Sequence, residues 1–264
     1  MFINRYIGGK DIFAVKKLKI PYGKIYDYVK ESNSKHHKIN HKLNLLALSE
    51  TNDSLHAVKL SSLFNPDIKS YLKQYYDIAI ENNNKILIDA ENVRDQEMIN
   101  YYTDYCIKTY NSNVFYKTYQ MYRKDSFDLL KTDLSNYSNA NNQPNFGIKL
   151  VRGAYLNEDK NTKLLFTNKN ETDFNYNSAI KLLADYNNDV IIASHNLLSC
   201  KIALETDKQF KYAQLLGMND KLSDYLLSKG QDVYKYIPYG KWSDSIPYLT
   251  RRLYENYDIL KYIY

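Results

Sequence analysis

The chain has 264 residues, 44% hydrophobic and 25% charged, which is a globular composition and excludes a disordered or fibrous protein. Its 36 basic and 30 acidic residues give a net charge of +6, and because this excess is spread along the chain we expect no nucleic-acid partner. The chain has two cysteines, Cys106 and Cys200, which are too few for a disulfide framework and are expected to pack as apolar groups. No apolar run reaches the ~20 residues that span a bilayer.

Eight short apolar segments recur along the chain, each the length of a buried strand and rich in β-branched or aromatic residues. In chain order they cover residues 23–29, 56–62, 85–90, 113–119, 146–151, 189–194, 210–216 and 232–237. Eight strand–helix units in this length predict parallel strands with crossover helices, as in a distorted (β/α)8 TIM-type barrel. The alternative is a doubly wound open sheet, but no GxGxxG turn follows any of these segments.

Polar stretches with helical spacing lie between the strands. Residues 69–83 have one apolar face, residues 172–186 begin with a Thr/Asp cap, and residues 219–230 end on a glycine. Ser243 or Asp244 is expected to cap the last helix.

Other stretches predict irregular structure. Residues 135–145 and 169–175 are interpreted as surface loops, the first because of its low complexity. Residues 1–22 are expected to contribute only a helical cap, with its helix at 12–20, to a single domain that covers 1–264.

Barrels of this kind place their active site at the C-terminal ends of the strands, so polar residues there are candidates. In chain order these are Glu31, Lys59, Asp89, Glu91, Gln120, Lys149, Arg152, Gly153, Ser194, His195, Asn196, Gln214 and Tyr236. Charged groups inside apolar strands are costly to bury alone, whereas convergence at one mouth would pair them. For any one of them the alternative is an outward-facing surface charge.

The last helix carries two adjacent arginines in YLTRRLYEN, residues 248–256. Tyr248, Arg251 and Glu255 share one face through i,i+3 and i,i+4 spacing, and Arg252 lies about 100° round the helix. Two guanidinium groups suit a carboxylate or a phosphate, and Glu255 would hold one of them in place. The alternative is a solvated charged face.

These motifs together resemble the proline dehydrogenase (proline oxidase) family, and most closely its eukaryotic mitochondrial branch. The matching stretches, in the family's order and over nearly the whole chain, are YDYVKE (26–31), VKLSSL (58–63), LIDAEN (87–92), TYQMY (118–122), KLVRGAY (149–155), ASHN (193–196), QLLGM (214–218), YIPYG (236–240) and YLTRRLYEN (248–256). The resemblance implies a barrel that holds FAD and oxidises L-proline to Δ1-pyrroline-5-carboxylate. Hydride would pass from proline C5 to flavin N5, and the electrons would then pass to a quinone such as ubiquinone.

The resemblance also implies roles for individual residues around the substrate. Arg251 and Arg252 would clamp the proline carboxylate with Lys59 as a third cation, and Glu31 would pair with Arg251 as a gate. The expected substrate-binding residues are Glu31, Lys59, Leu215, Tyr236, Tyr248, Arg251 and Arg252. The expected catalytic residues are Lys59, Asp89, Lys149, Tyr236, Arg251 and Arg252, with Asp89 steadying the cations from behind.

For the cofactor, the resemblance implies that Gln120 and Lys149 hydrogen-bond the flavin ring, where a cation would stabilise the anion formed by hydride transfer. Contacts with the ribityl and pyrophosphate groups are expected from Arg152, Gly153 and Tyr155. Contacts with the phosphate or adenosine end are expected from Ser194, His195, Asn196 and Gln214, and Glu255 is a further expected cofactor residue.

The family resemblance implies a mitochondrial protein on the matrix side of the inner membrane. The first ten residues, MFINRYIGGK, show neither a secretory signal core nor the Arg/Ser-rich helix of a transit peptide. Peripheral contact with the membrane through Lys16, Lys17 and Lys19 is a further hypothesis.

Three alternatives stay open beside proline oxidation. Hydroxyproline dehydrogenases belong to the same family, but Tyr236 would fill the space that a ring hydroxyl needs. A catalytically inactive flavin- or ligand-binding barrel would not need the arginine pair, Lys59 and Lys149 intact. A metal hydrolase is disfavoured, because HHKINH (36–41) lacks the convergent carboxylates of a catalytic metal site, and no metal is expected. This stretch is interpreted as a solvated loop, and His56 is interpreted as a structural residue.

Overall fold

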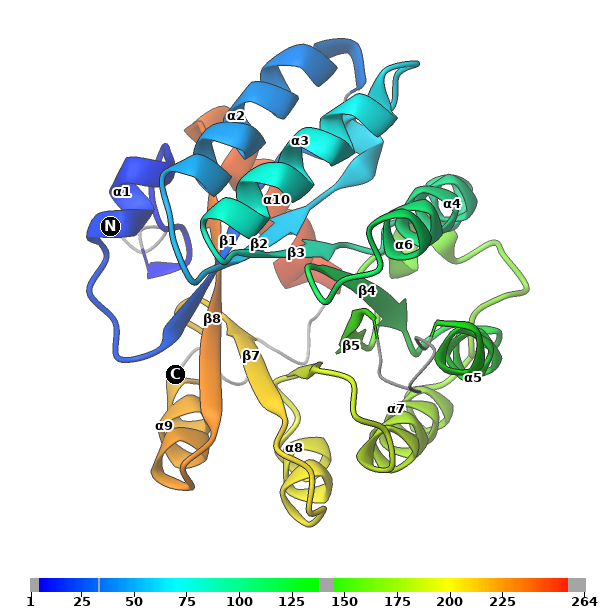
Figure 1. The fold of residues 1–264 in the computed structure, drawn as a ribbon. Coiled ribbons are helices and arrows are strands. Elements are labelled where there is room, and N and C mark those ends of the chain that lie inside the picture. Colours follow the sequence, from blue (N-terminus) through cyan, green and yellow to red (C-terminus); the bar gives the residue numbers. More distant parts are fainter. Residues whose placement is uncertain (1–4, 33, 138–144, 256–264) are drawn as a thin grey trace.

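The computed structural model describes residues 5–32, 34–137 and 145–255, with side chains as far as Thr250. Eight parallel strands close into a barrel in chain order (Figure 1). They are β1 (Gly23–Tyr28), β2 (Leu55–Val58), β3 (Lys85–Ile88), β4 (Phe115–Gln120), β5 (Gly147–Val151), β6 (Val190–Ala193), β7 (Lys211–Leu215) and β8 (Asp232–Tyr239). Each strand overlaps one predicted segment, so the predicted (β/α)8 barrel is confirmed and the open sheet is wrong.

The chain also forms helices, most of which lie around the outside of the barrel (Figure 1). They are α1 (Ile12–Lys17), α2 (His37–Ser49), α3 (Ile68–Glu81), α4 (Val93–Tyr110), α5 (Ser126–Asn136), α6 (Leu156–Asp159), α7 (Lys169–Ala184), α8 (Leu197–Leu204), α9 (Asp220–Ser228) and α10 (Trp242–Glu255). The predicted helices over 69–83 and 219–230 are confirmed as α3 and α9, and Gly230 follows α9 with a φ of +73°. That left-handed conformation favours glycine and ends the helix.

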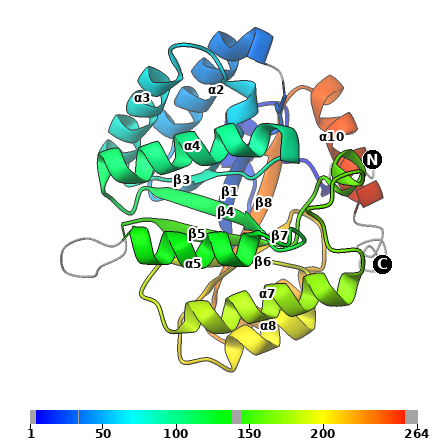
Figure 2. The same cartoon turned by 90° about the vertical axis from the view of Figure 1, so that its right-hand side faces the viewer.

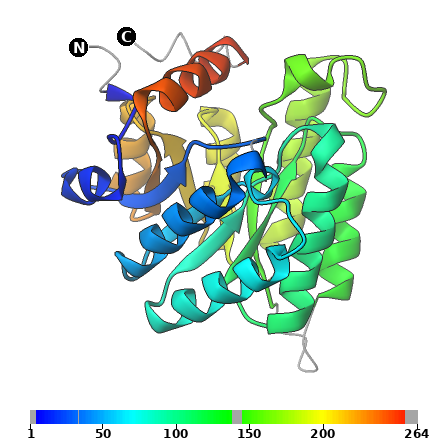
Figure 3. The ribbon, with the colours of Figure 1, turned by 90° about the horizontal axis from the view of Figure 1, so that it is seen from above.

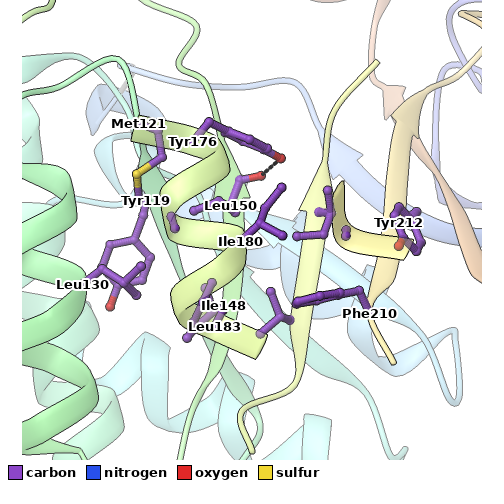
Figure 4. Packing of buried hydrophobic residues seen from close by; sticks show 14 of the residues in the cluster. Tyr119, Met121, Leu130, Ile148, Leu150, Tyr176, Ile180, Leu183, Phe210 and Tyr212 are labelled. Atoms are coloured by element: carbon purple, nitrogen blue, oxygen red, sulfur yellow. Dashed lines mark hydrogen bonds between the residues drawn. The ribbon is translucent and has the colours of Figure 1, made fainter. Parts of the chain in front are cut away.

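The outer wall of the barrel is held by apolar packing between strands and helices. Figure 4 shows α7 lying on β5 to β7, with Ile180 and Leu183 directed at the strands. The hydroxyl of Tyr176 donates a hydrogen bond to the carbonyl oxygen of Leu150 over 3.1 Å. Both cysteines are free and buried in such apolar clusters, as predicted.

The first and last helices occupy different places relative to the barrel. α1 lies outside the barrel (Figure 3), where Ile12 and Val15 pack against Tyr26 of β1 and Ile237 of β8. α10, which follows β8, lies instead at the end of the barrel where the strands finish (Figure 2). The predicted helical cap therefore lies against the side of the barrel, and the arginine-bearing helix lies over its mouth.

The start of α7 differs from the prediction. Asn168 has an extended backbone and its side chain accepts a hydrogen bond from the backbone N–H of Glu171 over 2.9 Å. This cap starts the helix at Lys169, so the cap predicted at the start of 172–186 and the loop predicted over 169–175 are both wrong. Of the other predicted loop, residues 138–144 lie outside the described residues, and the first two residues of 135–145 complete α5.

The predicted cap of α10 is also wrong. The helix begins at Trp242, so Ser243 and Asp244 lie in its first turn. Asp244 instead forms an ion pair with Lys30, with 2.7 Å between the carboxylate oxygen and Nζ. This pair ties the start of α10 to the segment that follows β1.

The histidine-rich stretch 36–41 is not a solvated loop, because α2 begins at His37. The ring of His41 is buried and stacks on Tyr71, with 3.8 Å between the ring centroids. His56 is buried as a structural residue, with 2.8 Å between its Nε2 and the hydroxyl of Thr51. Polar packing between α2 and α3, rather than solvent, therefore accounts for His41.

Candidate active site

Three charged side chains lie inside the barrel at the C-terminal ends of β1, β2 and β3. Successive side chains of a strand alternate between its two faces, so a residue two positions after an inward-facing one also points inward. Asp27, Lys59 and Asp89 each follow an interior apolar residue by two positions: Ile25, Ala57 and Leu87. Lys59 was predicted inside a strand over 56–62, but β2 ends at Val58 and a 3-10 turn follows at Leu60–Ser62.

These charges form one buried ionic network with Lys149 of β5. The Nζ of Lys59 lies between two carboxylates, in contact with Oδ1 of Asp27 and 3.3 Å from Oδ2 of Asp89. The Nζ of Lys149 contacts the other oxygen of Asp89. The two positive charges of the lysines cancel the two negative charges of the aspartates, and this pairing offsets the cost of removing four charges from water.

Two tyrosines close the network on the cavity side. The hydroxyl of Tyr236, on β8, donates to Oδ2 of Asp89, and that of Tyr248, on α10, donates to Oδ2 of Asp27 over 2.9 Å. The ammonium group of Lys59 lies 5.8 Å and 5.4 Å from the centroids of these two rings. The rings therefore separate Lys59 from the cavity while stabilising its charge.

The network shifts the pKa values of Asp89, Lys59 and Tyr236. Burial alone would raise the pKa of Asp89, but the ammonium groups of Lys149 and Lys59 lower it to about 2. Burial alone would lower the pKa of Lys59, but the carboxylate of Asp27 raises it above its ordinary value. Burial raises the pKa of Tyr236, so this residue stays a hydrogen-bond donor. Asp89 is thus a carboxylate at neutral pH, and its hydrogen bonds make it a poor proton acceptor.

A cavity of about 550 Å³ opens at this end of the barrel. One part of its wall carries Asp89, Gln120, Lys149, Leu215, Tyr236 and Tyr248. The other part carries Arg152, Gly153, Asn168, Lys169, Ser194, His195, Asn196 and Gln214. The lining therefore combines members of the ionic network with basic and amide groups.

Arg152 is held in place at the second part of the wall. Its guanidinium group donates to Asp173 over 2.7 Å, to the hydroxyl of Ser194 over 2.7 Å and to that of Ser199 over 2.8 Å. Its central carbon lies 4.3 Å from the centroid of the Tyr176 ring. A guanidinium group fixed in this way is already oriented for an anionic ligand.

At Gly153, next to Arg152, the backbone lines the cavity without a side chain. Its φ is +132°, and a Cβ built there would lie 2.4 Å from the ring of Tyr122. Nearby, the side chain of Asn196 caps α8 by accepting hydrogen bonds from the N–H groups of Leu198 and Ser199. The bare backbone and the positive end of the helix dipole both suit a phosphate group.

Histidine and glutamine side chains complete this part of the wall. The Nε2 of His195 accepts a hydrogen bond from the backbone N–H of Leu215 over 3.1 Å, and burial lowers the pKa of this histidine to about 3. His195 is therefore neutral. The amide of Gln214 donates to the carbonyl of Ser194 over 3.1 Å and accepts from the hydroxyl of Ser223 over 3.0 Å.

The structure brings most of the predicted site residues to one cavity, but not all. Lys59 is only 2% exposed and is not among the lining residues. The hydroxyl of Tyr155 donates to the carboxylate of Glu31 over 2.8 Å, and neither residue lines the cavity. The side chains of Arg251, Arg252 and Glu255 lie outside the described residues, so the clamp and the gate stay predictions.

Two buried acids near the cavity were missed. Asp27 is absent from the strand-end candidates, although the alternation of side chains in GKIYDY (23–28) puts this acid on the face opposite to its two tyrosine neighbours. Glu91 was noted at a strand end and given no role. Its carboxylate accepts hydrogen bonds from the N–H and the hydroxyl of Ser61, and its carbonyl accepts one from the amide of Gln120 over 2.8 Å.

The fold and the cavity define a (β/α)8 barrel with a ligand site at the C-terminal ends of its strands. The described residues contain no group of three or more His, Cys, Asp or Glu side chains that could hold a metal ion. A family model described as proline dehydrogenase matches residues 14–263. The chain belongs to the proline dehydrogenase family, as its motifs indicate, and members of this family are flavoenzymes.

Individual relatives agree with this assignment. Proline dehydrogenase 1, mitochondrial, of Drosophila melanogaster is 32% identical over 209 residues, which are 68% of this chain and 30% of the relative. Hydroxyproline dehydrogenase of Bos taurus is 33% identical over 167 residues, which are 55% of this chain and 36% of the relative. The chain thus spans about a third of the length of these relatives.

Solved structures share the fold. Proline utilization A (PutA) from Bdellovibrio bacteriovorus, inactivated by N-propargylglycine, superimposes with a TM-score of 0.82 at 18% identity, covering 97% of this chain and 32% of that one. Across the described ranges, no helix has both the length and the apolar character needed to cross a membrane.

Proposed function

We propose that this chain oxidises L-proline to Δ1-pyrroline-5-carboxylate with FAD as its cofactor. The observation that carries the proposal is the neutral network of Asp27, Lys59, Asp89 and Lys149 beside a cavity of about 550 Å³, in a chain of the proline dehydrogenase family. Two members of this network, Asp89 and Lys149, line the cavity, so their charges can act on a bound ligand.

The residues on the cavity wall fit FAD. Arg152, the backbone at Gly153 and the capped start of α8 would hold its phosphate groups. Gln120, whose amide already donates to the carbonyl of Glu91, and Lys149 would bind the flavin ring. Bound FAD supplies the hydride acceptor. The ammonium group of Lys149 would stabilise negative charge that develops there.

The first part of the wall fits a small cyclic amino acid. Leu215 and the rings of Tyr236 and Tyr248 provide an apolar surface for the pyrrolidine ring. Arg251 and Arg252 would bind the carboxylate group from α10. Proline oxidation needs no protein nucleophile, so the side chains act mainly by orienting the substrate and excluding water.

Hydroxyproline is the second candidate substrate, because a relative carries that name. We expect Tyr236 to disfavour it: this side chain lines the cavity and is held by its hydrogen bond to Asp89, and it would fill the space that a ring hydroxyl needs. We further propose a quinone acceptor and a mitochondrial location, since several relatives are named mitochondrial proline dehydrogenases.

The test is anaerobic mixing of the purified protein with L-proline while the visible flavin absorbance is followed. We expect a yellow protein whose flavin band bleaches with L-proline and is restored by a soluble ubiquinone analogue. Faster bleaching by trans-4-hydroxyproline would assign the second substrate instead. A protein that binds no added FAD would refute the proposed activity.

A further inference from the structure

Asp27 occupies a special place in the buried network. Its side chain is fully buried on β1, and both carboxylate oxygens are engaged, one by Lys59 and the other by Tyr248. Asp27 does not line the cavity, whereas Tyr248 does. Any influence of this acid on a ligand must therefore pass through the residues that it holds.

Tyr248 links Asp27 to the helix over the cavity mouth. Tyr248 and Leu249 of α10 pack with Val29 and Met218, and the hydrogen bond to Asp27 joins α10 to the inside of the barrel. A second polar contact between α10 and the β1 side of the barrel is the partly exposed pair of Lys30 with Asp244, one turn earlier. Solvent screens this partly exposed pair more than the fully buried hydrogen bond of Tyr248 to the carboxylate of Asp27, so we expect the buried bond to contribute more to the position of the helix.

The position of Tyr248 determines that of the next helical turn. An α-helix repeats every 3.6 residues, so Arg251 and Arg252 follow Tyr248 by about one turn. A shift or rotation of α10 at Tyr248 therefore moves the backbone of both arginines. Lys59, on the second oxygen of Asp27, prevents the carboxylate from following such a movement.

We propose that Asp27 is a positioning residue of the active site. It holds Tyr248 against the cavity wall and so fixes the turn of α10 that presents Arg251 and Arg252 to the acidic group of an amino-acid substrate. This inference rests on the proposed function, and it adds a residue to which the family motifs assigned no role.

The test compares Tyr248→Phe, which keeps the ring and removes the hydroxyl, with Asp27→Ala and the double variant. We expect Tyr248→Phe to raise the KM for L-proline about tenfold, the effect of losing one hydrogen bond to a charged group, with a smaller change in kcat. The affinity for FAD should stay within about twofold, which a general loss of structure would not allow. Adding Tyr248→Phe to Asp27→Ala should change KM by less than about twofold, because both changes remove the same interaction.

A matched control exists elsewhere in the barrel. Asp133 also accepts from a tyrosine hydroxyl, that of Tyr119 over 2.7 Å, and from a lysine, Lys117 over 2.8 Å. This trio lies between β4 and α5, and Tyr119 does not line the cavity. Tyr119→Phe should lower the Tm about as much as Tyr248→Phe and leave KM unchanged.

Several outcomes would overturn the inference. If Tyr248→Phe lowers only the Tm, as Tyr119→Phe does, Asp27 is purely structural. If the effects of Tyr248→Phe and Asp27→Ala on KM multiply, the tyrosine hydroxyl acts on the substrate independently of Asp27. Should Asp27→Ala fail to fold, Asp27→Asn replaces it, and Tyr248→Phe should then have a smaller effect in the Asp27→Asn background than in the wild type.

Wild-type protein that binds FAD but oxidises no proline would overturn the proposed function together with this inference, whereas active wild-type protein with unaffected variants would overturn the inference alone.

Discussion

Glu91 should make the stability of this protein depend on pH in an unusual direction. Its carboxyl group is fully buried, and burial raises its pKa from the ordinary 4.5 to about 7, against the opposing effect of the hydrogen bonds from Ser61 and the charge of Lys59. Between these pH values the folded protein keeps a proton that the unfolded chain has lost. Stability therefore falls as pH rises through this window, whereas depressed carboxyl pKa values give the opposite trend.

The magnitude follows from the two pKa values. A rise from 4.5 to about 7 corresponds to about 3 kcal/mol of free energy of unfolding, present below pH 4.5 and lost above pH 7. Glu91→Gln replaces the carboxyl group with a neutral group of the same shape. Its oxygen can accept the hydrogen bond from the N–H of Ser61, and its NH2 group can donate to the Ser61 hydroxyl, which reverses the direction of that second bond. The variant should match the wild type near pH 4.5 and exceed its stability by up to about 3 kcal/mol near pH 8.

The assay is urea unfolding of the wild type and Glu91→Gln at a series of pH values, with the difference in unfolding free energy plotted against pH. Glu97, an exposed glutamate on α4, provides the matched control, and Glu97→Gln should leave the curve of the wild type unchanged. A difference between Glu91→Gln and the wild type that does not vary with pH would refute the reasoning.

Other predictions concern the ligand and acid stability. Arg252→Met should raise the KM for L-proline at least about 100-fold with FAD still bound, measured by steady-state kinetics and flavin absorbance; unchanged proline kinetics would refute the clamp. Lys149→Met should slow flavin reduction by L-proline about 100-fold in stopped-flow experiments, because the positive charge beside the flavin is lost; an unchanged rate would contradict this role. Burial lowers the pKa of His56 to about 3, so the stability that its neutral form provides above pH 6.5 should decline as pH falls towards 3. Urea midpoints of His56→Asn should fall less over that range, and parallel curves would contradict the prediction.

The strands were predictable because their signal is local. Each of the eight segments has enough β-branched and aromatic side chains to indicate a buried strand, and the spacing between them leaves room for a crossover helix. Helix starts were less predictable, because several residues that can cap a helix lie close together. At α7, Asn168 competes with Thr172 and Asp173, and Asp173 instead binds the guanidinium group of Arg152.

The membership of the candidate site was only partly predictable. We predicted from their positions at strand ends that Asp89, Lys149 and Tyr236 lie close together, and they do, because parallel strands end at the same side of a barrel. The strand-end position of Lys59 could not show that this side chain would lie behind two tyrosine rings, since the depth of a side chain depends on what packs over it.

The sequence by itself determined the eight strand segments, the barrel and the family. Strand character and family motifs are patterns within short segments, and a repeated alternation of strand and helix implies parallel neighbours. Only the tertiary structure decided which inward charges meet. Asp27 and Tyr248 are 221 residues apart along the chain, and Asp89 and Tyr236 are 147 apart. Such pairs form only when β8 closes on β1 and α10 folds over the mouth, because hydrogen bonds need contact distances that no local pattern can specify.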